Sequence, residues 1–373
     1  MRTAIVHEWF VDYMGSEKCV ESFNNIYPES DVFALIDFLN DEDRQNILKG
    51  KKAKTSFIQK LPKSKTSYRT YLPLFPLAIE QLNISKYDVI ISSSHSVAKG
   101  VLTNSKQLHI CYCHTPMRYA WDLYHQYIYE SGLRKGIKGA VAKYFLHKIR
   151  MWDYISSQRV DHFVANSNYI AKRIKKVYGR NADVIYPPVD VNKFQLNKQK
   201  DDYYLIVARF VPYKKVDVVV KAFSKMPDKK LIVIGSGPDE EKIKQLAAGN
   251  IEFKGYQNEN ELTKFMQNAK AFIYAAEEDF GITIVEAQAA GTPVIAYGLG
   301  GANETVIQGK TGILFPEQTA DSIIAAVNKF EIETDNYDPE FIHSHAQQFS
   351  RDVFEKRIKE YVTEKLNQQK SLR

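Results

Sequence analysis

The chain has 373 residues, 44% of them hydrophobic and 25% charged, which suits a soluble globular protein of two or three domains. No apolar run approaches the roughly 18–20 residues of a membrane-spanning helix, and the N-terminus lacks the apolar stretch of a signal peptide, so we expect a cytoplasmic protein. Residues 1–190 hold 27 Lys and Arg against 18 Asp and Glu (+9), whereas the remainder holds 24 against 26 (−2). The first half is therefore expected to meet an anionic partner: nucleic acid, an anionic membrane or a phosphorylated acceptor.

Short apolar runs alternate with amphipathic stretches in the first half, which predicts βα units around a parallel sheet. The expected strands, in chain order, are Ala4–His7, Asp31–Ile36, Asp88–Ser92, Leu108–Cys113, His162–Ala165 and Val184–Tyr186.

The cysteines are Cys19, Cys111 and Cys113, an odd number that argues against a disulfide framework. Cys111 and Cys113 share one face of an expected strand, and His114 follows them. A zinc site needs a second pair of ligands, and none is visible. Packing within the strand is the preferred interpretation.

Residues 133–150 form a basic, partly amphipathic segment between two of these strands. Six lysines and arginines alternate there with apolar residues, and the segment has no acidic residue. An ordinary surface helix is the simpler interpretation. The alternative is attraction to anionic lipid headgroups.

The strand pattern stops and then restarts near residue 190. Pro187 and Pro188 cannot continue a helix or a central strand, and the polar residues 192–202 are interpreted as a linker. The strands expected after this break are Tyr203–Ala208, Lys230–Ile234, Ile251–Phe253, Ala271–Tyr274, Pro293–Ala296 and Gly312–Phe315.

The restart predicts two doubly wound, Rossmann-like α/β domains, residues 1–190 and 200–349. Residues 350–373 are expected to form a final helix, which either packs on the second domain or crosses back to complete the first.

The strongest chemical signal lies in residues 271–291. The strand Ala271–Tyr274 leads into a loop with Glu278, and Gly281 then opens a helix. Free backbone N–H groups and the helix dipole at such a start favour a phosphate. Glu278 can accept hydrogen bonds from sugar hydroxyls, and Glu286, about one and a half turns into the helix, from the hydroxyls of a ribose.

A second signal is the pair Arg209 and Lys214, which follows the strand Tyr203–Ala208. Both cations are expected at the carboxyl end of the sheet, where open α/β sheets bind ligands and where two positive charges neutralise a departing diphosphate. In isolation such a pair is more often a solvated surface feature. Together with the nearby motif of Glu278 and Glu286, however, a ligand-binding role is the preferred interpretation.

These motifs resemble those of the large retaining glycosyltransferase family 4, which has the GT-B fold of two Rossmann-like domains facing a cleft. The family's Arg-x4-Lys pair matches Arg209 and Lys214, and its Glu-x7-Glu motif matches Glu278 and Glu286. One departure is Lys215, where the family usually has glycine.

Further segments resemble the branch that contains O-antigen and exopolysaccharide mannosyltransferases. They are His7–Trp9, Gly15–Lys18, Ser92–His95, Cys113–Asp122, Ile185–Asp190 and Gly298–Thr305. The family's Gly-Gly loop reads Met14-Gly15-Ser16 here, a looser match.

The resemblance implies the roles of individual residues. Arg209 and Lys214 grip the donor diphosphate, Glu278 contacts the transferred sugar, and His114 lies across the cleft near the sugar; a locally bonded strand cap is the alternative for His114. Contacts to the nucleotide are expected from Gly15, Gly235, Gly255, Tyr256, Gly281, Ile282, Thr283 and Glu286. The Gly-Ser-Gly run from Gly235 lacks a third glycine, so it is interpreted as a tight turn and not as an NAD site.

The resemblance also implies a reaction. The donor is a nucleotide sugar, with GDP-mannose preferred and a UDP-sugar as the alternative, and transfer on one face needs no protein nucleophile and no metal cofactor. The acceptor is a glycan or a lipid-linked oligosaccharide in cell-surface polysaccharide or lipopolysaccharide synthesis. The protein is expected to lie peripherally on the inner face of the cytoplasmic membrane.

The sequence fits two other classes of protein less well. A nucleotide-sugar 2-epimerase or a glycan phosphorylase shares the architecture, but the paired Arg/Lys and Glu/Glu motifs argue against both. Nucleic-acid binding is not favoured, because the positive residues are scattered and form no recognised motif.

Overall fold

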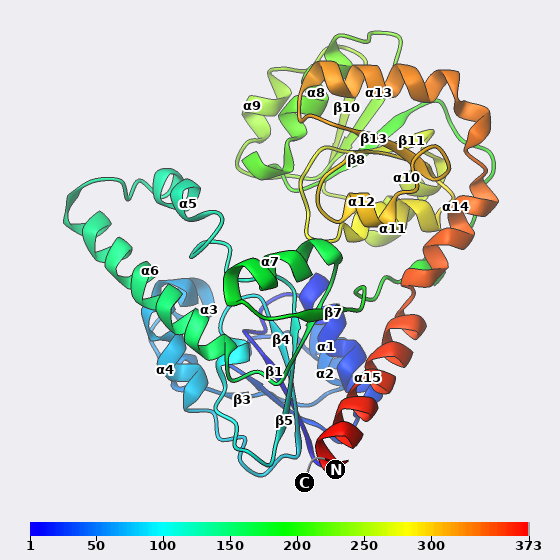
Figure 1. Cartoon of the computed structure of the whole chain (residues 1–373). Helices are drawn as coiled ribbons and strands as arrows, with labels where there is room; N and C mark the ends of the chain where they lie inside the picture. The colour runs from blue at the N-terminus through cyan, green and yellow to red at the C-terminus, as the bar shows by residue number, and fades with distance from the viewer. Residues whose placement is uncertain (372–373) are drawn as a thin grey trace. The chain divides into compact units, whose positions relative to one another are not determined.

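A computed structural model describes residues 1–371 and divides into two compact units (Figure 1). The first unit contains Met1–Tyr186 and the chain from Phe354 on, and the second contains Pro187–Val353. Each unit is built on a single parallel sheet.

The sheet of the first unit has the strand order β3-β2-β1-β4-β5-β6-β7. The chain runs outward from β1 to β3 and then returns to place β4 on the other side of β1. Its strands are β1 (Thr3–His7), β2 (Asp31–Ala34), β3 (Lys54–Thr55), β4 (Val89–Ser94), β5 (Leu108–Cys113), β6 (His162–Ala165) and β7 (Ala182–Val184). Its helices are α1 (Gly15–Ile26), α2 (Asp41–Leu48), α3 (Ser64–Ser67), α4 (Phe75–Glu80), α5 (Tyr124–Glu130), α6 (Gly136–Ser157), α7 (Asn168–Tyr178) and most of α15 (Arg351–Ser371).

Helices cover both faces of this sheet because alternate strand residues point to opposite sides. In β1, Ile5 belongs to the core beneath α1, α2 and α15, while Ala4 and Val6 belong to the core on the other face. Cys111 and Cys113 likewise point toward the core under α7. The two thiols are therefore packing residues of β5.

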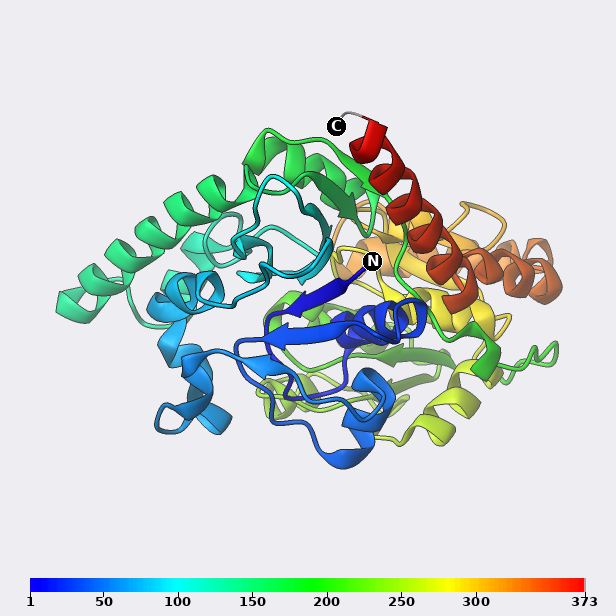
Figure 2. The ribbon, with the colours of Figure 1, turned by 90° about the horizontal axis from the view of Figure 1, so that it is seen from below.

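The C-terminal helix α15 packs on the first unit. Phe354, Ile358 and Val362 are at most 3% exposed and join the core formed with α1 and α2. The Phe354 ring lies 5.8 Å from that of Phe23 on α1, and the two helices run side by side in both views (Figure 1, Figure 2). The sequence left open whether this helix packs on the first or the second domain, and it packs on the first.

The sheet of the second unit has the order β10-β9-β8-β11-β12-β13. Its strands are β8 (Tyr204–Val207), β9 (Leu231–Ile234), β10 (Ile251–Gly255), β11 (Ala271–Tyr274), β12 (Val294–Tyr297) and β13 (Gly312–Phe315). Its helices are α8 (Val216–Ser224), α9 (Glu240–Lys244), α10 (Glu259–Asn268), α11 (Ile282–Ala289), α12 (Ala302–Thr305), α13 (Ala320–Ile332) and α14 (Pro339–Ala346). Figure 1 shows α8 and α13 on one face of this sheet and α11 on the other.

Each predicted strand agrees with an observed strand to within two residues at either end, and the two largest differences are a strand that was not predicted and a shifted one. The short β3 was not predicted, because two residues give no readable pattern. The last strand of the first unit ends at Val184 rather than at Tyr186. Pro187 and Pro188 follow and have no N–H to donate to a neighbouring strand, so pairing stops before them.

Residues 192–202 are not a free linker. They pack within the second unit, where Lys200 donates hydrogen bonds to Gln267 O, Ala290 O and Thr292 Oγ1 at 2.7, 3.0 and 2.9 Å. Burial lowers the pKa of Lys200 to about 8. A polar segment was mistaken for a linker because its lysine bonds inward to backbone oxygens.

Among residues 1–371, no helix has the length and apolarity required to cross a membrane.

Candidate active site

In the second unit the predicted motifs meet at the point where the strand order reverses. Strands β8 and β11 are neighbours, yet three helices and two strands separate them along the chain. Loops that leave such a pair diverge and open a crevice at the carboxyl edge of the sheet. Arg209 and Lys214 follow β8, and Glu278 follows β11.

Lys214 and Glu278 form an ion pair at this edge of the sheet. The Lys214 ammonium also donates to the Tyr274 hydroxyl at 3.3 Å. Burial acts to lower the pKa of Lys214, but Tyr274 and Glu278 outweigh it and leave that pKa raised. Lys214 therefore stays cationic at neutral pH, which suits contact with an anionic group.

Arg209 is exposed and has no ion-pair partner among the residues that the structure describes. Its backbone is held by the glycine turn after β9. Phe210 N donates to Ser236 O at 2.8 Å, and a Cβ on Gly235 (φ +135°) would lie 1.9 Å from Ala208 O. A glycine is thus required for the turn to approach the Arg209 loop.

Helix α11 begins without a side-chain cap. Gly281 precedes it with φ +87°, a left-handed conformation that glycine adopts readily. The first backbone N–H groups, at Ile282 and Thr283, have no acceptor within the helix and suit an anionic ligand. The Thr283 side chain hydrogen-bonds Tyr274, which joins the helix start to the Lys214–Glu278 pair.

A second glycine pair fixes the backbone of Glu278. Gly301 N donates to Glu278 O at 2.8 Å. A Cβ on Gly300 would lie 2.3 Å from Glu278 O, and one on Gly301 would lie 2.2 Å from the Cα of Phe280. The loop after β12 can lie against the Glu278 loop only because both residues are glycine.

The remaining predicted nucleotide contacts lie on either side of this centre. Glu286 is half-buried on α11. Burial acts to lower the pKa of Lys193, but Glu259, Asp190 and, to the smallest extent, Glu286 outweigh it and leave that pKa raised. Gly255 lies at the end of β10, where its carbonyl accepts from Gly235 N at 2.9 Å, and the Tyr256 side chain is 83% exposed. A large exposed ring beside the crevice suits contact with a base.

The first unit has a separate polar centre at its own reversal point, between β1 and β4. Four side chains form a hydrogen-bonded chain there. Glu17 Oε1 lies 3.2 Å from His7 Nε2, His7 Nδ1 lies 3.2 Å from Ser93 Oγ, and Ser93 Oγ lies 2.8 Å from His114 Nε2. These hydrogen bonds fix the orientation of the His114 ring.

His114 is held neutral in this centre. Burial, with the neighbouring His95 and His7, lowers the pKa of His114 well below its ordinary value. A neutral imidazole can accept or donate a hydrogen bond to a sugar hydroxyl. The predicted Gly15 opens α1, two residues before Glu17, so its loop borders the same centre.

Glu8 is fully buried beside these histidines and accepts five hydrogen bonds. Its Oε1 accepts from the Ser94 hydroxyl and from the N–H groups of His95 and Ser96 at 2.7–3.1 Å. Its Oε2 accepts from the N–H groups of Val97 and Ala98 at 2.7 and 3.0 Å. The carboxylate therefore fixes the loop after β4 that carries His95.

Two family models match consecutive stretches of the chain. The model described as "Glycosyltransferase Family 4" matches residues 32–193, and the one described as "Glycosyl transferases group 1" matches residues 189–344. The chain belongs to glycosyltransferase family 4, group 1.

Curated relatives match over part of their length. A glycosyltransferase of Methanocaldococcus jannaschii, itself uncharacterized, is 31% identical over 182 residues, which is 46% of this chain and 51% of that protein. A GDP-mannose-dependent alpha-(1-6)-phosphatidylinositol monomannoside mannosyltransferase of Mycobacterium tuberculosis is 30% identical over 200 residues, 45% of this chain and 52% of that protein. The chain thus spans about half the length of the curated relatives it matches.

Solved structures confirm the GT-B fold. HepE of Anabaena, crystallised with UDP, superposes with a TM-score of 0.72 at 16% identity, covering 98% of this chain and 100% of that one. A sucrose-phosphate synthase of Thermosynechococcus elongatus gives a TM-score of 0.73 at 15% identity, covering 98% and 99%.

The structure explains why glycine is usual at the position where this family 4 chain has Lys215. Lys215 has φ +56° and ψ +28°, in the left-handed region where glycine is favoured. We expect Lys215→Gly to raise the free energy of unfolding by about 0.5–1 kcal/mol, because relief of the left-handed strain exceeds the entropy that glycine adds to the unfolded chain. Denaturant unfolding measures this. A Lys215→Val variant, with a branched side chain at the same position, should instead be less stable than wild type.

Several residues at the two centres were not predicted as site residues. Tyr274 ends a predicted strand directly before the Glu278 loop, so its position in the sequence could have indicated a site residue. Glu8, Glu17 and Ser93 lie inside segments quoted for the family resemblance, but which of their atoms would meet was not readable. No three His, Cys, Asp or Glu side chains within residues 1–371 are grouped so as to hold a metal ion, and metal independence stays a prediction.

Proposed function

We propose that the chain transfers a sugar from a nucleotide-sugar donor to a glycan or lipid-linked oligosaccharide. The observation that carries this proposal is the Lys214–Glu278–Tyr274 cluster beside the uncapped start of α11. It provides a fixed cation, an acceptor for sugar hydroxyls and free backbone N–H groups on adjacent loops of the sheet.

The proposed reaction retains the configuration of the sugar. The bond between the anomeric carbon and the donor phosphate breaks, and a bond to the acceptor oxygen forms on the same face. The hydroxyl proton of the acceptor passes to the leaving phosphate. Arg209 and Lys214 stabilise the charge that develops on that phosphate, and no metal cofactor is required in this scheme.

GDP-mannose is the proposed donor. Its support is the resemblance of the motifs to mannosyltransferases and the name of the mycobacterial relative. A UDP-sugar is the alternative, since HepE was crystallised with UDP and with UDP-glucose. The neighbouring fold alone does not decide between the bases.

A donor panel tests the proposal. Binding and slow hydrolysis of GDP-mannose, GDP-fucose, UDP-glucose, UDP-galactose and UDP-N-acetylglucosamine are measured with and without EDTA. Turnover of GDP-mannose alone, unaffected by chelator, is the expected result. Turnover of a UDP-sugar instead would retain the class of reaction and reject the donor. No binding or turnover of any donor would reject the function.

We propose that helix α6 binds a membrane surface and that the protein lies at the inner face of the cytoplasmic membrane. Figure 2 shows its N-terminal half projecting from the first unit. Ile137 is 85% exposed, and Val141, Tyr144 and Phe145 are exposed beside it. Exposed apolar side chains flanked by lysines, without acidic neighbours on residues 133–150, fit an interface with anionic headgroups.

Reversing Lys138, Lys143 and Lys148 to glutamate should weaken binding to phosphatidylglycerol vesicles at least about tenfold, since each basic residue near an anionic surface contributes about 1 kcal/mol. Co-sedimentation measures this. The control reverses the exposed Lys242, Lys356 and Lys359, with the same change in charge, and should bind as wild type does. Equal loss in both variants, or no binding by wild type, would remove α6 from the proposal.

A further inference from the structure

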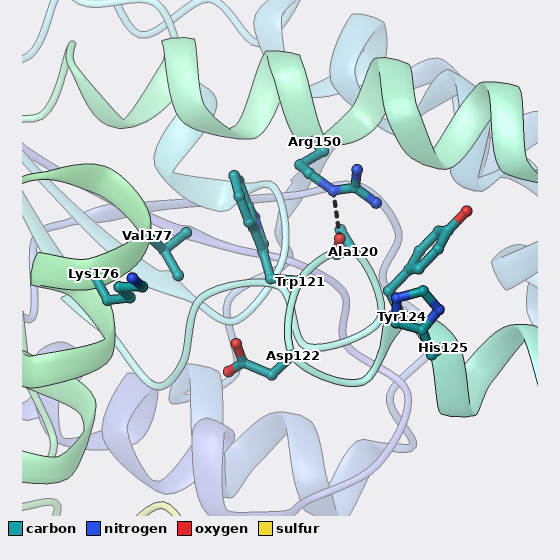
Figure 3. A pocket seen from close by; sticks show the side chains of 8 residues that line it. All are labelled: Ala120, Trp121, Asp122, Tyr124, His125, Arg150, Lys176 and Val177. Atoms are coloured by element: carbon teal, nitrogen blue, oxygen red, sulfur yellow. Dashed lines mark hydrogen bonds between the residues drawn. The ribbon is translucent and has the colours of Figure 1, made fainter.

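The first unit has a pocket of about 600 Å³, which is lined in part by the end of the segment Cys113–Asp122 (Figure 3). Its walls come from the loop after β5, from the start of α5, and from α6 and α7. The lining residues that matter are Ala120, Trp121, Asp122, Tyr124, Arg150 and Lys176. All of them belong to the first unit.

Arg150 is fixed in the wall of this pocket. Its Nε donates to Ala120 O at 2.7 Å, and the guanidinium carbon lies 4.8 Å from the centre of the Tyr124 ring and 5.8 Å from that of Trp121. Its two terminal nitrogens have no hydrogen-bond partner among residues 1–371. A guanidinium that is oriented by one bond and two rings, with its outer edge free, is preorganised for a planar or tetrahedral oxyanion.

The positive charge of the pocket is not neutralised by the acidic residues around it. Asp153 is fully buried and accepts from Lys99, from Trp121 Nε1 at 2.7 Å and from Tyr178 at 2.9 Å. Asp122 pairs with Arg173 on α7.

Both carboxylates are thus engaged elsewhere. Lys176 is exposed on α7 and has no ion-pair partner in the described part of the chain. Arg150 and Lys176 therefore leave an uncompensated positive charge at the pocket.

The same walls present aromatic rings. Trp121 and Tyr124 are half-buried, and the Trp121 indole is anchored through its N–H to Asp153, so its orientation is set from inside the unit. In Figure 3 the Trp121 ring stands between the side chains of Arg150 and Lys176. Rigid aromatic faces next to charged polar groups suit a ligand with an apolar ring face and an anionic substituent.

We infer that this pocket binds a phosphorylated sugar, with the phosphate held by Arg150 on one side of the Trp121 ring, the sugar ring against Trp121 and Tyr124, and Lys176 adding positive charge from the other side. This inference rests on the proposed function, for which it supplies an acceptor subsite selective for sugars that carry a phosphate.

The tryptophans allow a local test in the full chain. The protein has three, Trp9, Trp121 and Trp152, so 5-fluorotryptophan labelling gives three ¹⁹F signals, and Trp121→Phe assigns one of them. Titration with glucose 1-phosphate is expected to shift the Trp121 signal saturably. Glucose should leave it unmoved, and inorganic phosphate should need at least about five times the concentration.

Variants separate recognition from folding. Arg150→Ala should weaken glucose 1-phosphate binding about tenfold, the typical effect of losing one charge-assisted hydrogen-bond donor, and Lys176→Ala should weaken it about threefold through the loss of a nearby positive charge. Lys175→Ala removes an equal charge from the same helix outside the pocket and should bind as wild type does. The Trp9 and Trp152 signals report whether each variant keeps its fold, and the exposed Lys176 tests the inference even where Arg150→Ala does not fold.

The outcomes distinguish this inference from the proposed function. No Trp121 shift, equal affinity for inorganic phosphate, or unchanged affinity in Lys176→Ala overturns the subsite, even if the wild-type protein hydrolyses a nucleotide sugar. A Trp121 response to glucose 1-phosphate that depends on Lys176, in a protein that hydrolyses no donor, supports the subsite and rejects the proposed function.

Discussion

Replacing Lys214 by alanine is expected to lower kcat for sugar transfer by about 10²–10³-fold, with a smaller effect on KM. The lysine is cationic, is held by Glu278 and Tyr274, and lies on the loop after β8. Its contribution is greatest when negative charge develops on the leaving phosphate, so its loss acts mainly on the transition state. Steady-state kinetics with the preferred donor measure the effect.

Arg209→Ala should give a loss of similar size, because its exposed guanidinium has no ion-pair partner among residues 1–371 and so can pair with the donor phosphate. Lys215→Ala is the matched control. It removes a neighbouring charge from the same loop, outside the motif, and should keep turnover within a few fold of wild type. Near-wild-type kcat in both Lys214→Ala and Arg209→Ala would refute the assignment of these residues to the diphosphate.

Glu8→Gln is expected to destabilise the first unit by about 3–5 kcal/mol. A glutamine at this position keeps one acceptor oxygen and places an NH₂ group against at least two of the five donors that Glu8 satisfies. Buried N–H groups then lose their acceptor and oppose another donor. Denaturant unfolding, monitored by hydrogen exchange at the backbone amides of the first unit, measures the change.

Glu42→Gln, the same substitution at an exposed position on α2, provides the control and should change stability by less than about 0.5 kcal/mol. A loss below about 1 kcal/mol in Glu8→Gln would show that the loop after β4 does not depend on the carboxylate.

The same residue predicts a dependence on pH. Burial acts to raise the pKa of Glu8, but the neighbouring His95 and His7 and the N–H groups of Val97 and Ser96 outweigh it and leave that pKa lowered. A lowered folded-state pKa contributes stability that is present above the unfolded value of about 4.5 and is lost as the pH falls below it. Wild-type stability should therefore fall more steeply below about pH 4.5 than that of Glu8→Gln.

The catalytic candidates of the second unit were predictable because each follows a strand. Arg209 and Glu278 come after apolar runs of four to six residues, and parallel strands bring their carboxyl ends to one edge. The order β8–β11 then makes Lys214 and Glu278 partners. The sequence does not predict that pairing, since its spacing gives the edge of the sheet but not which loops are adjacent.

The polar centre of the first unit was less predictable. The motif indicates His114, but the contact of His114 with Ser93 depends on the register of β4 and β5. The contact of His7 with Ser93 depends on the pairing of these two residues in β1 and β4. A shift by one residue would turn these side chains to opposite faces. Register is set by the whole sheet, so one sequence could not supply it.

The return of α15 to the first unit also has a consequence for synthesis on the ribosome. The core under α1 and α2 lacks Phe354, Ile358 and Val362 until residues 354–371 have been translated. Residues 187–353, although made later than residues 1–186, are contiguous and can complete their fold first. The earliest-made part of the chain is thus the last to close its core, and during translation it is the part whose apolar surface a chaperone would meet.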